Sequence, residues 1–136
     1  MASNTQSIGV AYSDPEFTTC YASEELGYSA AAQGTVTQLT DKSTAVTLNK
    51  SAGQITMSNA ALAAATNVTF TLTNSLLSTK DVVIVNVASA NATAGAYNAW
   101  ISSMLAGSCT ITLRNITAGS LSEAVVINFA IIHAAS

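Results

Sequence analysis

The sequence predicts an all-β protein: an antiparallel β-sandwich or jelly roll of about eight strands, with an extended N-terminal arm. From Gly34 onward, short runs of β-branched and apolar residues are separated by turn residues, and no long helical pattern interrupts them. Before Gly34 the sequence is irregular and its apolar runs are too short to form an element. We therefore divide the chain into an N-terminal arm, residues 1–33, and a β-domain, residues 34–136.

The first half of the β-domain contains three predicted strand regions and one loop. A short run begins at Val36. Residues 46–57 predict a hairpin, because apolar and polar residues alternate on both sides of a turn at residues 51–53. Residues 59–65 are rich in alanine and fit a loop or one helical turn. Residues 68–72 show the clearest alternation in the chain, with threonine on the outward face.

The second half contains four further strand regions. Residues 82–88, which follow Asp81, are nearly all apolar and predict a strand buried on both faces. Residues 97–105 predict a strand, although a short helix would also fit. Residues 109–115 alternate again. Residues 124–132 are apolar on both sides, which predicts a central strand or one whose second face meets a partner.

The arm has features of a segment that needs a surface to lie on. Asp14-Pro15 predicts a turn, and aromatic residues stand apart along the arm. Residues 23–33 fit a short helix capped by Ser23, which Gly27 weakens. No Lys or Arg precedes Lys42, so the acidic residues of the chain are concentrated here: Asp14, Glu16, Glu24 and Glu25.

The composition excludes two classes of partner. Charged residues make up 8% of the chain, against about 25% in an average soluble domain. Four basic residues are too few for the positive surface that nucleic-acid binding requires. No apolar stretch reaches the roughly 18 residues of a membrane helix, and the N-terminus lacks the pattern of a secretory signal. With so little charge, we expect much of the surface to be covered in an assembly.

No constellation of residues predicts catalysis, a metal site or a cofactor site. The single histidine, His133, follows an apolar strand near the C-terminus and is expected to be a solvated end residue. The carboxylates of Asp81 and Glu123 are expected to serve as edge charges. Trp100 is expected in the core or an interface, with stacking on a ligand as the alternative. Cys20 and Cys109 do not have a metal-type spacing, and whether they form a bond stays open. We expect no enzyme.

Several phrases of the β-domain resemble a family of small virion proteins of tailed bacteriophages and prophages. The similarity covers residues 34–132, and the phrases that carry it are GTVTQLTDKSTAVTLNKSAGQITMSNAALA, NVTFTLTNS, DVVIVNVAS and RNITAGSLSEAVVINFAII. The opening SIGVAYSDPEF also resembles N-terminal arms of some members. These phrases are turns and strands, so the resemblance implies no catalytic residues.

The resemblance implies a capsid decoration (cement) protein, located on the capsid surface of the virion and made in the host bacterial cytoplasm. Such a protein binds the major capsid protein and commonly assembles as a homotrimer. The hypothesis is that the arm lies along the capsid protein, with Tyr12, Pro15, Phe17 and Tyr21 as its anchors. The alternative is a receptor-binding or adhesin domain of a phage tail or head fibre. The chain lacks the extended repeat of a long fibre, which favours decoration.

Overall fold

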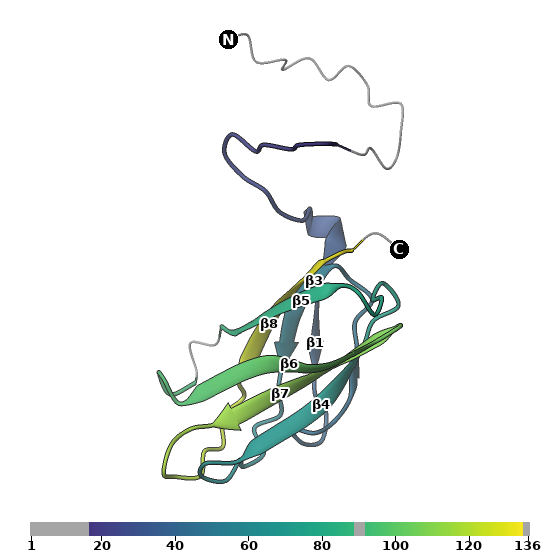
Figure 1. Ribbon diagram of the computed structural model, residues 1–136. Helices are drawn as coiled ribbons and strands as arrows, with labels where there is room; N and C mark the ends of the chain where they lie inside the picture. The colour runs from purple at the N-terminus through teal and green to yellow at the C-terminus, as the bar shows by residue number, and fades with distance from the viewer. Residues whose placement is uncertain (1–16, 89–91, 135–136) are drawn as a thin grey trace.

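The computed structural model describes residues 17–88 and 92–134. Within these ranges the chain forms eight strands and a single short 3-10 helix, η1 (Ala30–Ala32). The strands are β1 (Gln33–Thr37), β2 (Val46–Thr47), β3 (Ala52–Thr56), β4 (Asn67–Thr73), β5 (Val82–Val87), β6 (Tyr97–Leu105), β7 (Ser108–Asn115) and β8 (Val126–Ile132) (Figure 1). The all-β prediction is confirmed.

The strands form two sheets that share one core. One sheet has the order β1-β3-β8-β5 and the other β2-β4-β7-β6. Both sheets contribute alternate residues of their strands to a single buried cluster, as period-2 side-chain geometry requires. Its largest fully buried apolar side chains are Phe70, Ile55, Met57, Leu72, Ile111, Leu113, Ile127, Ile131 and Val125.

The sheets are mixed rather than antiparallel throughout, which corrects the prediction. β1 pairs with β3 and β2 with β4 in parallel, whereas all other strand pairs are antiparallel. The reason is the chain path. The first four strands alternate between the two sheets, so β1 and β3 enter their sheet from the same end.

The predicted hairpin over residues 46–57 is wrong for the same reason. β2 lies in one sheet and β3 in the other, and the residues between them cross the sandwich instead of turning back. Gly53 belongs to β3, where it is paired with Gly34 of β1. A Cβ at Gly53 would lie 2.6 Å from the carbonyl oxygen of Gly34 and 2.8 Å from a methyl group of Leu48. This glycine permits close packing and does not form a turn.

The remaining predictions divide between confirmed and wrong. β4 and β7 follow the predicted alternation, β6 forms a strand over the predicted residues 97–105, and β8 is central in its sheet, as expected. β5 was expected to be buried on both faces, but it is an edge strand whose outward side chains Val82 and Ile84 are exposed. Of the short helix predicted over residues 23–33, only η1 forms.

Candidate functional site

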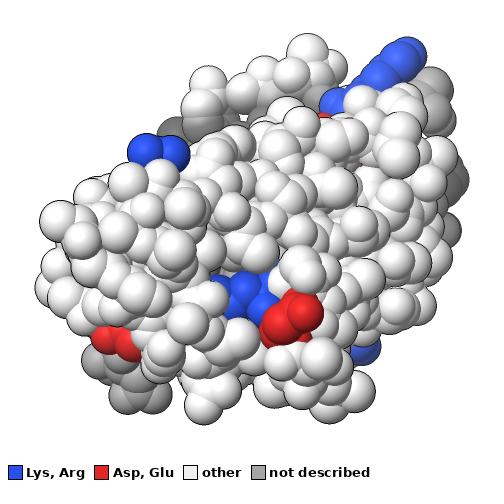
Figure 2. All heavy atoms as spheres, turned by 90° about the horizontal axis from the view of Figure 1, so that it is seen from below, with Lys and Arg blue, Asp and Glu red and all other residues white. Residues whose placement is uncertain are grey.

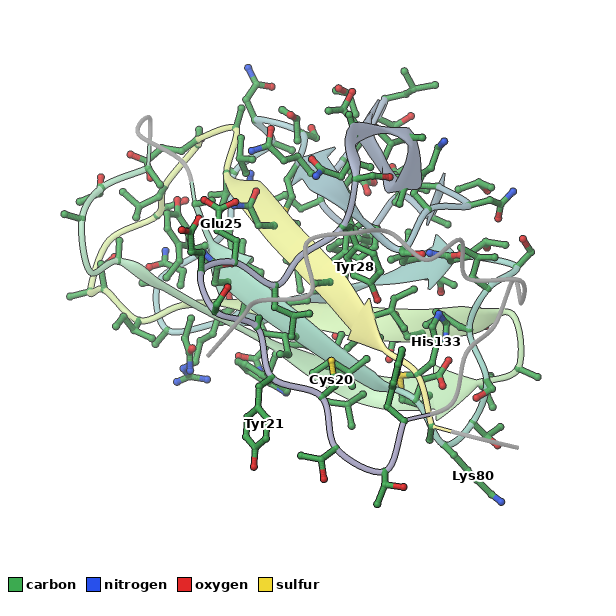
Figure 3. All side chains as sticks on the ribbon, turned by 90° about the horizontal axis from the view of Figure 1, so that it is seen from above. Cys20, Tyr21, Glu25, Tyr28, Lys80 and His133 are labelled. Carbon is green, nitrogen blue, oxygen red and sulfur yellow. The ribbon has the colours of Figure 1, made fainter. Side chains whose placement is uncertain are left out.

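Residues 17–29, hereafter the leading segment, carry exposed apolar side chains above one end of the sandwich (Figures 1 and 3). The exposed fractions are 65% for Phe17, 92% for Tyr21 and 89% for Leu26. No hydrogen bond joins residues 17–27 to the strands in the described part of the chain. Phe17 and Tyr21 are thus largely exposed and without hydrogen bonds to the strands, whereas Tyr12 and Pro15 lie outside the described residues. Exposed aromatic side chains of this kind suit contact with another surface.

The leading segment is attached to the sandwich at its root, around Tyr28. The Tyr28 hydroxyl donates a hydrogen bond to the carbonyl oxygen of Ile131 on β8, and the side-chain amide of Gln33 donates to the carbonyl oxygen of Tyr28 over 2.9 Å. Figure 3 shows Tyr28 beside β8 and Tyr21 pointing away from the strands. An apolar cleft of about 550 Å³ lies between the root and the sheet; its lining residues are Leu26, Gly27, Tyr28, Ile84, Ala130, Ile131, Ile132 and His133.

A carboxylate and an imidazole meet at this same end of the sandwich. Asp81 precedes β5 and His133 follows β8, and the antiparallel pairing of Val82 with Ile132 brings the two together. His133 Nδ1 lies 3.0 Å from Asp81 Oδ2. The expectation that Asp81 is a solvated edge charge is wrong, because its side chain is fully covered. The His133 side chain is 47% exposed, so it is only partly the solvated end residue expected.

The Asp81 carboxylate joins neighbouring segments of the chain through hydrogen bonds. Its oxygens accept hydrogen bonds from the backbone N–H of Ser78 at 2.8 Å and of Ala134 at 2.9 Å. These bonds, with Ser78 first, and the bond with His133 hold the pKa of Asp81 well below its usual range, against the opposing effect of burial. Asp81 therefore ties the C-terminal end of β8 to the start of β5.

The Asp81–His133 pair lacks the third member of a nucleophilic triad. Such a triad needs a hydroxyl or thiol on the second imidazole nitrogen. In residues 17–88 and 92–134, the hydrogen bonds of His133 reach Asp81 and do not reach a hydroxyl or thiol. The same residues contain no group of His, Cys, Asp and Glu that could hold a metal ion.

The opposite end of the sandwich is closed by a buried amine. Lys42 is 3% exposed. Its ammonium donates hydrogen bonds to the carbonyl oxygens of Ser58 and of Glu123, the latter over 2.6 Å. Burial lowers the pKa of Lys42, and the neighbouring Glu123 carboxylate partly offsets this. Figure 2 views the molecule from this end. It shows basic atoms next to acidic atoms at one place on a surface that is otherwise largely uncharged.

Glu123 links a further loop to the same cluster. Its carboxylate accepts hydrogen bonds from the hydroxyl of Thr93 at 2.7 Å and from its backbone N–H at 3.0 Å, and these lower the pKa of Glu123. Burial, followed by the nearby Glu123 carboxylate, raises the pKa of Tyr97 strongly. No hydrogen bond of ordinary geometry reaches the buried Tyr97 hydroxyl from the described residues. The sequence did not signal this cluster, since its members lie in four separate loops or strand ends.

Trp100 lies on the outer face of the second sheet, not in the core. It is part-buried and stands opposite Thr112 on β7, while Asn98 stands opposite Arg114. The Arg114 guanidinium donates to the Asn67 side-chain oxygen over 3.0 Å. The core interpretation of Trp100 is therefore wrong, and an indole beside polar side chains remains available to a partner.

The two cysteines are separate free thiols. Cys20 is exposed on the leading segment (Figure 3), and Cys109 is buried in the core. Burial raises the pKa of the Cys109 thiol to about 11, which makes it unreactive near neutral pH. Among the described residues, no helix is long and apolar enough to cross a membrane.

No known protein family, curated protein or solved structure matches the chain.

Proposed function

We propose that the chain is a virion structural protein of a tailed bacteriophage, a capsid decoration protein that binds the major capsid protein and stabilises the head. The observation that carries this proposal is the leading segment, whose side chains Phe17, Tyr21 and Leu26 are exposed to solvent. Apolar side chains on a segment without a surface of its own gain free energy when they are covered. We propose that the protein binds the capsid through a two-sheet body of the jelly-roll kind that carries an N-terminal arm.

The rest of the molecule supports a structural role. Single buried charged groups, Lys42 and Asp81, fasten the loops at the two ends of the body. Among described residues, charge on the body is sparse, which suits a surface that packs against other proteins at high density. The hydrogen bonds of Asp81 and His133 hold the start of β5 and the end of β8 together.

The proposal is tested with heads assembled without this protein, to which the purified full chain is added back. Phe17→Ala should weaken binding to the heads by roughly 1–3 kcal/mol, because a truncated aromatic anchor loses its buried contacts. Leu39→Ala is the matched control: Leu39 is 91% exposed but follows β1 at the opposite end of the body. Sedimentation of the heads with bound protein measures both variants.

The result that would count against the proposal is equal binding by wild type, Phe17→Ala and Tyr21→Ala. Copy number per virion gives a second measure. Hundreds of copies per particle are expected of decoration, whereas a handful to a few dozen are expected of an appendage.

One observation favours a second candidate, an adhesin domain that recognises bacterial surface sugar. Trp100 lies on an outer sheet face next to Asn98 and Arg114, and an indole with neighbouring amide and guanidinium donors can stack on a sugar ring and bond its hydroxyls. A glycan array probed with wild type and with Trp100→Ala separates the two functions. Specific sugar binding that is lost in Trp100→Ala supports the adhesin.

A further inference from the structure

The apolar cleft at the Asp81 end lies between two parts of the same chain. One wall is the outer face of the β1-β3-β8-β5 sheet, where Ile84 of β5 and Ile132 of β8 are 53% and 56% exposed. The other wall is the leading segment at Leu26, which is 89% exposed. Contact between the two walls would remove three large apolar side chains from water, which is favourable.

The sheet wall of the cleft is hollowed at Ala130. Ala130 pairs with Ile84 across the β5–β8 ladder, and Ile132 lies two residues further along β8 on the same face. A cross-strand partner and the residue two positions along the strand are close neighbours on one face of a sheet. The small side chain of Ala130 therefore leaves a depression between two branched side chains, which a large aliphatic side chain of the segment can enter.

The exposed apolar patch is confined to the end of the sheet from which the leading segment departs. Elsewhere on this outer face the side chains are mostly polar: one row across the four strands consists of Thr35, Gln54, Asn128 and Asn86. The exposed large apolar residues of the face are Val82, Ile84 and Ile132, where β5 begins and β8 ends. The patch is thus adjacent to the segment that carries Leu26.

The root already holds the segment against this face, and the next residue can act as a hinge. The Tyr28 hydroxyl donates to the Ile131 carbonyl oxygen, and the Gln33 amide donates to the Tyr28 carbonyl oxygen, which keeps Tyr28 beside β8 (Figure 3). Gly27 separates Tyr28 from Leu26, and a Cβ at Gly27 would meet no atom of the described residues within 4 Å. Because glycine adopts many backbone conformations, rotation at Gly27 can move Leu26 while Tyr28 stays bonded.

We propose that the leading segment closes on the sheet, with Leu26 seated on Ala130 between Ile84 and Ile132. Phe17 and Tyr21, which lie N-terminal to Leu26, stay exposed in this closed position. Closure fixes the direction in which they leave the body, and this lowers the entropy that is lost when they bind a partner. The inference concerns the free chain and does not depend on the proposed function. It removes Leu26 from the side chains that a partner would contact.

The first test is limited proteolysis of the full chain with a protease that cuts after glutamate, because Glu24 and Glu25 directly precede Leu26. A protease needs an extended, detached segment, so the cleavage rate follows the open population. Ile84→Asn alters one wall of the cleft without altering the cleavage sites, and it should be cut roughly tenfold faster than wild type.

Val82→Asn is the matched control for this test. Val82 lies on the same strand and the same outward face as Ile84 and is 56% exposed, but it is not among the residues that line the cleft. Its variant should be cut at the wild-type rate. Equal cleavage of wild type and Ile84→Asn, or the same acceleration in both variants, would overturn the proposal.

The second test traps the closed position with a disulfide, in a Cys20→Ser background that removes the exposed thiol. Leu26→Cys and Ile84→Cys in one chain should form an intramolecular bond on mild oxidation, because seating brings the two Cβ atoms to the separation that a disulfide requires. Leu26→Cys with Val82→Cys should form it much more slowly. The bonded 26–84 protein should resist cleavage at Glu24 and Glu25 until it is reduced. Equal rates for the two cysteine pairs would overturn closure and leave the cleft to an apolar group of a partner.

Discussion

The two ends of the sandwich are closed in the same way but differ in what lies beside the closure. At one end the Lys42 ammonium binds backbone carbonyl oxygens, and at the other the Asp81 carboxylate binds backbone N–H groups. Each ion joins chain segments that are distant in sequence. The Lys42 end is a set of loops tied to one another, whereas the Asp81 end adjoins the root of the leading segment at Tyr28 and the apolar cleft.

Because both ends contain a buried charge, such a charge by itself is poor evidence for a functional site. Backbone groups at strand ends have no ladder partners and must be satisfied locally. A single ion satisfies several of them at once, and both ends use this solution. The Asp81 end, where we propose that the protein binds its partner, is distinguished by its exposed apolar surface and by the leading segment that begins there.

The largest expected effect is at the Lys42 end. Lys42→Met keeps the approximate side-chain volume but leaves the carbonyl oxygens of Ser58 and Glu123 without their donor, so it should lower the free energy of unfolding by about 2–3 kcal/mol. Urea unfolding measures the change. Lys80→Met, at an exposed lysine, is the control and should change little. Undiminished stability in Lys42→Met would show that the amine does not hold this end together.

The Asp81 end should respond to acid. Because the pKa of Asp81 is lower in the folded chain than in the unfolded chain, the unfolded chain takes up the proton first as the pH falls below about 4, and stability falls with it. Asp81→Asn cannot titrate, so its stability at neutral pH should be lower and its loss in acid shallower. Asp41 and Glu123, whose pKa values are also lowered, should leave a residual slope. Parallel acid profiles for the two proteins, from chemical unfolding, would contradict this account.

The smallest expected effect is at the root of the leading segment. Tyr28→Phe removes the hydrogen bond to Ile131, which is worth about 1 kcal/mol, and it should loosen the segment without unfolding the body. Limited proteolysis should cut the segment faster in Tyr28→Phe, with the unfolding midpoint nearly unchanged. Tyr21→Phe serves as the control, since that side chain is 92% exposed. Equal cleavage rates in all three proteins would mean that the Tyr28 bond does not hold the root.

Local pattern was enough to predict the strands that are part of regular antiparallel ladders. Residues 68–72 and 109–115 alternate because one face is core and the other is threonine-rich; that outer face is partly exposed on β4 and largely covered on β7, where Thr112 is buried. Residues 124–132 are apolar on both sides, and β8 is indeed central. The exposed aromatic residues Phe17 and Tyr21 could also be identified from the irregular stretch around them.

Local alternation did not predict the structural features that depend on residues distant in the sequence. The apolar run of β5 reads as a strand buried on both faces, but its place in the sheet is set by β8, and its outer face is exposed. Ala52 and Gly53, expected in a turn, belong to β3, because the chain crosses from one sheet to the other before this strand begins. The Asp81–His133 contact arises only from the register of β5 on β8.

Residue type and period-2 alternation were enough to predict that this protein is all-β, sparsely charged and built of short strands. The neighbours of each strand, the apolar face that stays uncovered and the charged groups that are buried were established by the three-dimensional structure. Those features depend on pairs of residues far apart in the chain, and local alternation contains no information about them.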